Sequence, residues 1–330
     1  MIIFSRIPAF MVYIIFSFLL LGLELAYFRI ADYYNIIDHP NERSSHTVVT
    51  LRGGGIIFPL ALILYSLNSN FKYPYFTSAL LLISIISFVD DIKNISNRLR
   101  LIVQLIAVGI MFYHFQLWDQ YIWILISSYI MVIGAINAYN FMDGINGITG
   151  LYSLSIISPI IYLNQSLKFI DNSFLLIIVL SILIFLFFNF RVKARCFAGD
   201  VGSVSMAFIV LFVMISLVIT THEYLYLLFL IVYGMDSGLT MIIRLLKREN
   251  IFEPHRKHAY QLLSNELKFP QLTVSGLYAS LQLLINGSII YIIFLNGSNL
   301  AKLIFVLVVV FFLLILYLST SIYSQHKIVR

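Results

Sequence analysis

Long runs of apolar residues, separated by short polar connections, dominate this chain of 330 residues. A helix needs about 20 apolar residues to cross a hydrocarbon layer of about 30 Å, and eleven stretches approach that length. The predicted spans are 10–30, 54–68, 74–90, 100–115, 120–139, 147–163, 172–190, 201–220, 223–246, 272–295 and 299–323. Because no repeat or linker divides them, the pattern predicts an all-α polytopic integral membrane protein. Residues 1–330 form one transmembrane domain in this prediction, with about eleven helices.

Composition supports this class and excludes others. The chain is 61% hydrophobic and 11% charged, whereas soluble domains are about 45–50% apolar. The single cysteine, Cys196, excludes an intramolecular disulfide framework and a cysteine-based zinc site. The net charge of +6 comes without a basic soluble face, so no nucleic-acid partner is expected. The first apolar run is too long for a signal peptide and lacks a small-residue cleavage site, so we expect it to remain as a helix.

Polar and basic residues gather in alternate connections between the predicted spans. The odd-numbered connections are 31–53, 91–99, 140–146, 191–200 and 247–271. They hold twelve Lys and Arg residues, whereas the even-numbered connections hold only Lys72 and Lys168. The positive-inside rule therefore makes the five odd connections cytoplasmic. Eleven spans then put the N-terminus outside and the C-terminus in the cytoplasm. The prediction requires all five polar loops to meet on one side of a cytoplasmic, or inner, membrane.

The strongest single motif is Asp90-Asp91, at the end of the third predicted span. Adjacent carboxylates at a membrane boundary are costly unless they bind a cation or transfer a proton. The plainer alternative is a helix end that meets water. Carboxylates at a helix C-terminus oppose the helix dipole, which weakens that alternative.

The second motif runs from Asn137 through Asn140, Asp143 and Asn146 to Gly150. The first three polar residues are three positions apart, so they share one helical face if the helix continues. The interleaved glycines allow a ligand to approach the backbone closely. A calcium-binding EF-hand is excluded because the regular Asp/Asn spacing and the closing Glu are absent.

The third motif, residues 195–203, contains Phe197 and places Asp200 at the start of the eighth predicted span. Here a carboxylate could simply cap a helix N-terminus. Its flanking glycines and the nearby basic residues Arg191, Lys193 and Arg195 favour an anionic ligand instead.

Two further loops carry basic residues. His255, Arg256 and His258 could hold phosphate oxygens, Arg256 in a bidentate manner, although a solvated basic loop is the plainer alternative. A zinc site is discounted because the loop has only two histidines and no cysteine. The first loop, residues 38–55, contains Arg43 and His46 and ends in Arg52 and three glycines. Glycines at a helix start suit phosphate binding, but no Walker A loop is present.

Two ionisable residues lie within the ninth span. Asp236 and Arg244 are eight positions apart, on roughly one helical face. An ion pair and a catalytic role are both open for them.

The side-chain types in the five polar loops together indicate which reaction the protein catalyses. Asp and Asn oxygens without cysteine suit a hard cation, Mg²⁺ or alternatively Mn²⁺. Basic residues suit phosphate, a cytoplasmic face suits a nucleotide-activated substrate, and a membrane body suits a lipid acceptor. Together these features predict metal-assisted phosphoryl transfer from a soluble nucleotide to a lipid.

Four motifs together resemble one enzyme family. They are Asp90-Asp91, Asn137-x-x-Asn140-x-x-Asp143-Gly, Gly199-Asp200-x-Gly-Ser203 and His255-Arg-x-His258-x-Tyr-Gln261. In order and topology the chain resembles the polyprenyl-phosphate N-acetylhexosamine-1-phosphate transferases, from about Asp38 to Gln261. This glycosyltransferase 4 type includes the phospho-muramoyl-pentapeptide translocase and the enzymes that initiate O-antigen and enterobacterial common antigen. The form of the last motif resembles the O-antigen branch, hence lipopolysaccharide and cell-wall biogenesis.

The resemblance implies a reaction and a set of roles. N-acetylhexosamine-1-phosphate, or a 6-deoxy derivative, would pass from a UDP-sugar to undecaprenyl phosphate, with UMP released. Asp90 would orient or deprotonate the attacking lipid phosphate, Asp91 would help to hold the assembly, and Asp143 would complete the catalytic cluster. Asn140 and Asp200 would be the metal ligands. The implied substrate-binding residues are Arg43, His46, Asn137, Asn146, Phe197, His255, Arg256 and His258, of which Asn146 and Phe197 would face the uracil. The membrane lipid surrounds the enzyme, and a homodimer is compatible with this interpretation.

Other interpretations stay open on sequence alone. A transporter or flippase of a sugar-lipid would bury charges in mid-span and often show a repeat, whereas this chain concentrates its acids at one face and shows no repeat. A CDP-alcohol phosphotransferase would need a compact Asp-Gly-Ala-Arg motif, which is absent. The family usually reads Pro-Thr-Pro where this chain has Val49-Thr50-Leu51, so its first loop is expected to be less stiff. The sugar and the choice between direct and covalent mechanisms stay open.

Overall fold

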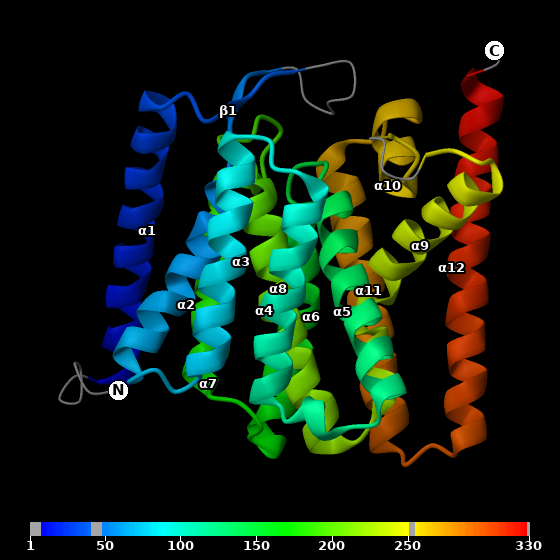
Figure 1. Cartoon of the computed structure of the whole chain (residues 1–330). Coiled ribbons are helices and arrows are strands. Elements are labelled where there is room, and N and C mark those ends of the chain that lie inside the picture. Colours follow the sequence, from blue (N-terminus) through cyan, green and yellow to red (C-terminus); the bar gives the residue numbers. More distant parts are fainter. Residues whose placement is uncertain (1–7, 41–47, 251–254, 329–330) are drawn as a thin grey trace.

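The structure is a computed structural model that describes residues 8–40, 48–250 and 255–328. Its helices run mostly side by side between two ends of a bundle (Figure 1). The helices are α1 Ala9–Tyr33, α2 Ile57–Asn68, α3 Pro74–Ile92, α4 Asn97–His114, α5 Ile122–Met142, α6 Ile148–Leu167, α7 Asn172–Asn189, α8 Gly199–Thr221, α9 Ile231–Leu246, α10 Ala259–Gln261, α11 Gln271–Phe294 and α12 Asn299–Ile328. Short 3₁₀ helices are η1 Gly54–Ile56, η2 Leu117–Asp119 and η3 Tyr224–Leu230, and a π-helical turn, η4, covers Leu262–Glu266. Strands β1 Ile37–Asp38 and β2 Thr50–Leu51 pair antiparallel.

The all-α membrane architecture is confirmed, but the count of eleven spans is wrong. Within the described residues, eight helical segments are long and apolar enough to cross a membrane. The predicted spans 54–68, 100–115 and 147–163 are helical without meeting both conditions. Helix α2, with 12 residues, is only about 18 Å long at 1.5 Å per residue. Polar residues lower the hydropathy of the other two, including Arg98 and Arg100 in α4 and Asn164 in α6.

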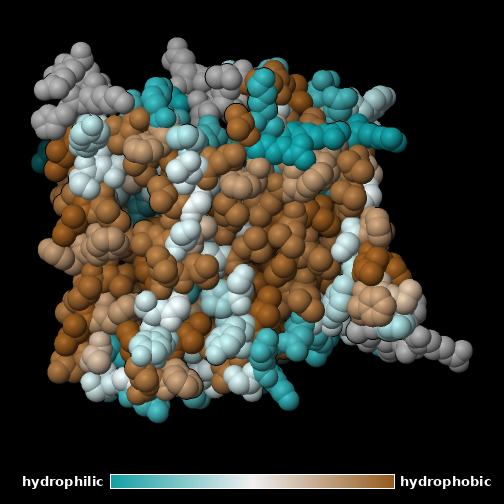
Figure 2. All heavy atoms as spheres, turned by 180° about the vertical axis from the view of Figure 1, so that it is seen from behind, coloured by the Kyte–Doolittle hydropathy of each residue, from teal (hydrophilic) through white to brown (hydrophobic). Residues whose placement is uncertain are grey.

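The surface shows an apolar band between two hydrophilic ends (Figure 2). The described parts of the segments that follow α1, α3, α5, α7 and α9 lie at the upper end in Figure 1. The predicted convergence of the polar loops is therefore present in the fold. Which end faces the cytoplasm stays a prediction from the distribution of Lys and Arg.

Helix α8 is the centre of the bundle. It packs against α2, α3 and α5, and 78% of its 18-residue apolar stretch is buried inside the protein. Phe212 of α8 packs on Phe76 of α3 with ring centroids 4.2 Å apart. This packing brings the ends of α3 and α5 next to the start of α8, so three motif segments meet there.

The ninth span is interrupted where η3 gives way to α9. Backbone groups at such a break need partners, because the bilayer core supplies no water. Gln282 of α11 accepts hydrogen bonds from the backbone N–H of Val232 (3.0 Å) and from the hydroxyl of Tyr152 (2.7 Å). The Tyr152 hydroxyl in turn accepts from the backbone N–H of Tyr233 at 3.2 Å. Beyond the break, α9 runs obliquely toward α12 (Figure 1).

Candidate active site

Three carboxylates and two guanidinium groups meet at the polar end of the bundle. Asp90 and Asp91 lie in the last turn of α3, and Asp200 lies in the first turn of α8. Arg52 Nε is 2.6 Å from Asp91 Oδ1, and its Nη2 is 3.6 Å from Asp200 Oδ1. Arg100 Nη1 is 2.8 Å from Asp90 Oδ2 and 3.2 Å from Asp200 Oδ2. The two arginines thus connect all three acids.

Asp91 has a structural role that its neighbour lacks. Its two carboxylate oxygens accept hydrogen bonds from the backbone N–H groups of Asp200 and Val201, both at 2.9 Å. The side chain of Asp91 is fully buried. Asp90 instead accepts a hydrogen bond from the backbone N–H of Ile95, in the segment after α3, at 2.6 Å. Asp91 therefore caps α8 from another helix, while the side chains of Asp90 and Asp200 keep small exposed fractions of 9% and 17%.

We expect Asp91→Ala to destabilise the protein. The change leaves two buried N–H donors at the start of α8 without their acceptor, and each costs about 1–3 kcal/mol. The midpoint of thermal unfolding in detergent should fall by roughly 5 °C. Asp119→Ala removes an exposed carboxylate and serves as the control. An unchanged midpoint for Asp91→Ala would contradict the capping role.

Glycines bring two loops into close contact beside this cluster. The backbone N–H groups of Gly54 and Gly55 donate to the carbonyls of Phe197 (2.8 Å) and Ala198 (3.0 Å). A Cβ atom added to Gly55 would lie 2.3 Å from the Cα of Gly202. The sequence suggested that these glycines would offer N–H groups to phosphate. Instead, the N–H groups of Gly54 and Gly55 hold the loop of Arg52 against α8.

The Asn/Asp motif contacts the first turns of α8. Asn140 Oδ1 accepts from the hydroxyl of Ser203 at 2.9 Å, which places Asn140 next to the first turn of α8. Asp143 follows the end of α5 and accepts from the hydroxyl of Thr149 at 2.5 Å. Withdrawal from water raises the pKa of Asp143 to about 7, and the nearby charge of Asp91 acts in the same direction. Asp143 is thus a carboxyl group poised to gain or lose a proton near neutral pH.

Three residues near this motif are predicted to bind substrate. The structure shows hydrogen bonds to other parts of the chain for two of them and a half-buried ring for the third. The Asn137 amide donates to the carbonyl of Ile133 (2.8 Å) and to Gln104 (3.4 Å). The buried Asn146 amide donates to the carbonyl of Arg191 at 2.8 Å, so it fixes the basic loop after α7. Phe197 is half-buried. Contact with uracil stays a prediction for Asn146 and Phe197, as does substrate binding for Asn137.

A buried aspartate organises the basic loop after α9. Asp236 accepts hydrogen bonds from the backbone N–H groups of Ala259 (2.9 Å) and Tyr260 (3.2 Å) and from the Tyr278 hydroxyl (2.6 Å). One of its oxygens is 3.3 Å from Nδ1 of His258. Asp236 thus anchors the loop that bears the histidines, and the alternatives of an ion pair and a catalytic role stay open beside this structural role. Arg244 is 3.2 Å from a carboxylate oxygen of Glu249.

The other residues of this loop lie nearer the surface. His255 and Arg256 are half-buried, and the rings of His255 and His258 are 4.9 Å apart. Burial and the neighbouring positive charges lower the pKa of His255 to about 4, so this imidazole is neutral at physiological pH. The Tyr260 hydroxyl donates to the carbonyl of Phe141 at 2.9 Å and ties the loop to the end of α5. Arg43 and His46 lie outside the described residues.

We expect Asp236→Asn to weaken substrate binding more than it slows chemistry. Loss of the charge removes the partner that orients His258. The free energy needed to order the basic loop around bound substrate therefore increases. KM for the soluble substrate should rise about tenfold with a smaller change in kcat, as measured by steady-state kinetics. Tyr278→Phe, which removes one of the hydrogen bonds, should shift KM in the same direction by less. Equal loss of kcat with KM unchanged would contradict this positioning role.

Several contributors to the site have no role in the predictions from sequence. Arg52 appears there only as the start of a glycine run, and Arg100 only as the first residue of a predicted span. Ser203 is part of the third motif but has no role in the predictions, and Thr149 is absent from them; their hydroxyls bond to Asn140 and Asp143. Arg100 carried a usable signal, because an arginine at the start of an otherwise apolar helix is a functional candidate by default.

The donor set suits Mg²⁺ but not a closed protein cage. No group of three or more His, Cys, Asp and Glu side chains within the described residues is arranged to hold a metal ion. Mg²⁺ usually needs only one or two carboxylates, with phosphates and waters completing its octahedron. Asp200 and Asn140 offer oxygens of that kind, since Asp200 lies in the first turn of α8 and Asn140 contacts that turn.

Comparison with known proteins agrees with this arrangement. Residues 73–218 match the sequence model of Glycosyl transferase family 4. The matched segment contains Asp90, Asp91, Asn140, Asp143 and Asp200. The chain is also similar to the Phospho-N-acetylmuramoyl-pentapeptide-transferase of Thermotoga neapolitana. The two are 27% identical over 237 residues, which are 64% of this chain and 76% of that protein. Residues 73–218 of this multi-pass membrane protein thus resemble Glycosyl transferase family 4, and the chain is distantly similar to that transferase.

Proposed function

We propose that the protein transfers a sugar-1-phosphate from a UDP-sugar to a polyprenyl phosphate such as undecaprenyl phosphate, and releases UMP. One observation carries the proposal: a group of three carboxylates and two arginines lies at the polar end of a lipid-facing bundle. It offers oxygens for a hard cation and guanidinium groups for phosphate, within reach of a membrane-bound acceptor. The family match over residues 73–218 supports the same chemistry.

The reaction is a displacement at phosphorus. An oxygen of the lipid phosphate attacks the sugar-bearing phosphorus, the bond from that phosphorus to the bridging oxygen of UMP breaks, and UMP leaves with the electron pair. Asp90 orients the incoming phosphate or takes its proton. Arg52 and Arg100 exchange their carboxylate partners for phosphate oxygens as charge develops. Mg²⁺, held by Asp200 and Asn140, would supply charge neutralisation on the pyrophosphate.

The remaining residues are proposed to select the donor. His255, Arg256 and His258 contact phosphate and sugar, and Asn146 with Phe197 faces the uracil. We propose an N-acetylhexosamine, or its 6-deoxy derivative, as the sugar, because the His-Arg-x-His form of the last motif resembles the branch that initiates O-antigen. The active site then lies on the cytoplasmic side of a bacterial inner membrane, because UDP-sugars are made in the cytoplasm.

The test is release of UMP from purified protein supplied with Mg²⁺ and undecaprenyl phosphate. The donors compared are the UDP derivatives of N-acetylglucosamine, N-acetylgalactosamine, N-acetylfucosamine, N-acetylquinovosamine and N-acetylmuramoyl-pentapeptide. We expect UMP with one N-acetylhexosamine donor, and none when lipid or metal is omitted. Absence of UMP with every donor would refute the transferase. Release only with the muramoyl-pentapeptide donor would reassign the sugar and retain the reaction.

A further inference from the structure

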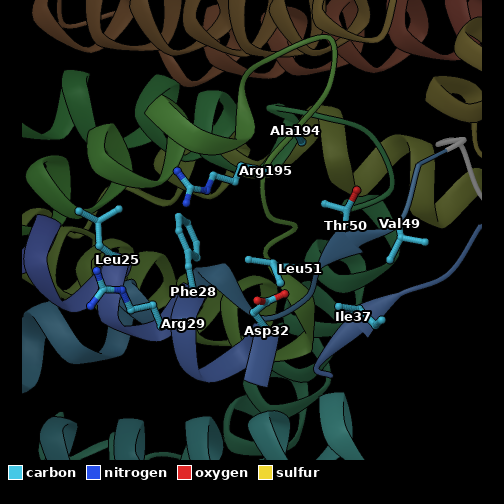
Figure 3. Close-up of a pocket in the computed structure, with 10 residues that line it drawn as sticks. All are labelled: Leu25, Phe28, Arg29, Asp32, Ile37, Val49, Thr50, Leu51, Ala194 and Arg195. Carbon is cyan, nitrogen blue, oxygen red and sulfur yellow. The ribbon is translucent and has the colours of Figure 1, made fainter. Parts of the chain in front are cut away.

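A groove lies beside the carboxylate cluster, between α1 and the loop after α7. Its volume is about 600 Å³. Figure 3 shows the residues that line it. The lining residues are Leu25, Phe28, Arg29, Asp32, Ile37, Val49, Thr50, Leu51, Ala194 and Arg195. Arg195 is the first residue of the third sequence motif, but none of the ten contacts the carboxylate cluster. The groove therefore calls for a separate occupant.

Strand β2 and the residue after it separate the groove from the carboxylate cluster. Leu51 lines the groove, whereas Arg52 turns away from it and reaches Asp91 at 2.6 Å. Opposite orientations of successive residues are usual for extended chain. The loop after α7 is divided in the same way, because Arg195 lines the groove and Cys196 is buried behind it. A molecule in the groove would thus contact both loops that hold the active site without entering it.

The chemistry of the groove is amphipathic. Leu25, Phe28 and Leu51 make an apolar wall, and the guanidinium group of Arg195 lies 5.1 Å from the ring centroid of Phe28. In Figure 3 the guanidinium groups of Arg29 and Arg195 lie on the same side of the groove, while the carboxylate of Asp32 points toward Leu51. Within the described part of the chain, Asp32 forms no ion pair with either arginine. The groove therefore presents the positive charges of Arg29 and Arg195 and, not paired with either, the negative charge of Asp32.

The position of the groove points to a lipid. Helix α1 lies at the edge of the bundle, and only 28% of its 18-residue apolar stretch is buried inside the protein. Leu25 and Ile30 are exposed on it, while Tyr33 and Tyr34 are exposed at its polar end, as is typical of the boundary between hydrocarbon and headgroups. An acyl chain could lie along α1 while its headgroup occupies the groove.

We propose that the groove binds the headgroup of a phospholipid that carries both a phosphate and a primary ammonium group, as in phosphatidylethanolamine. The phosphate pairs with Arg195 and Arg29, because guanidinium forks match phosphate oxygens. The ammonium pairs with Asp32, which would otherwise repel an anionic headgroup. The bound lipid joins α1 to the loops of Arg52 and Asp200.

Native mass spectrometry of the detergent-solubilised chain tests the preference without requiring turnover. Phosphatidylethanolamine, phosphatidylglycerol and phosphatidylcholine with identical acyl chains compete as probes. The native chain should retain phosphatidylethanolamine about threefold better than the other two, because partly exposed charge pairs are individually weak. Equal retention of the three lipids would overturn the proposal.

Two variants separate the two charged contacts. Arg195→Gln should lower retention of phosphatidylethanolamine and phosphatidylglycerol alike, because both carry the phosphate. Asp32→Asn should abolish the preference for the ammonium headgroup and raise retention of phosphatidylglycerol. Arg98→Gln removes an exposed positive charge outside the groove and is the control. Unchanged lipid preference in Asp32→Asn, with native thermal stability, would also overturn the assignment.

Discussion

Asp200→Asn is expected to lower the rate of UMP release roughly a thousandfold, since electrostatic groups aimed at developing charge contribute on that scale. Asparagine keeps the shape of the side chain but removes the charge that two arginines share and that the proposed metal ion would also contact. Arg52 lies 3.6 Å and Arg100 3.2 Å from this carboxylate, so both lose a partner together. The rate is measured with lipid and UDP-sugar at saturation.

Controls for this variant separate loss of chemistry from loss of fold. Insertion into membranes and the midpoint of thermal unfolding should stay near those of the native protein, because the backbone N–H groups at the start of α8 bond to Asp91. Asp119→Asn, an exposed change in η2, should retain full activity. Partial recovery at high Mg²⁺ concentration would identify Asp200 as a metal ligand, whereas native activity in Asp200→Asn would remove this residue from the site.

Asp143→Asn is expected to lower the rate about a hundred- to ten-thousandfold, the usual range for loss of a general acid or base. Burial raises the pKa of Asp143 to about 7, so the carboxyl is mostly neutral at pH 6 and mostly anionic at pH 8. If the anion is the active form, the rate of the native enzyme increases tenfold per pH unit below pH 7 and levels off above it. Asp143→Asn should lose this limb of the pH profile.

Metal and stability measurements extend the test of Asp143. A cation bound nearby favours the carboxylate, so the midpoint of the limb should move below pH 7 as the Mg²⁺ concentration rises. The folded state holds this proton more tightly than the unfolded chain, in which the carboxyl has its ordinary pKa of 3.8. The contribution of Asp143 to stability therefore falls as pH rises from about 4 to 7. Asp143→Asn should be at least as stable as the native protein at pH 8. A pH profile unchanged by the substitution would exclude Asp143 as the titrating group.

The apolar pattern located the helices well but overstated how many span a membrane. Every predicted span contains a helix, because a long run of Leu, Ile and Phe has few other solutions in lipid. A count based on apolar stretches did not separate a full span from α2, which has 12 residues, or from a helix that begins with Arg98 and Arg100. The grouping of the motif loops at one end followed from the alternation of connections alone.

The identity of partners could not be read from the chain. Asp200 looked like a cap of its own helix, but Asp91 from α3 caps α8. Arg100 pairs with acids 10 and 100 positions away, and those contacts depend on how α3, α4 and α8 pack. Local spacing reports which side chains share a face, whereas such contacts require the positions of three helices. Asp236 shows the same limit, since its partners in the histidine loop and α11 lie 22 to 42 positions later.

The break between η3 and α9 constrains how the protein is assembled. Its backbone partners are Tyr152, which is synthesised earlier, and Gln282, which lies on α11 and is synthesised later. Until α11 arrives, the N–H of Val232 has no acceptor at that depth, and a bare donor in hydrocarbon costs several kcal/mol. The ninth span should therefore remain in contact with water or the insertion machinery until α11 enters the membrane. The basic loop between them, which carries the histidines, would then reach its place last.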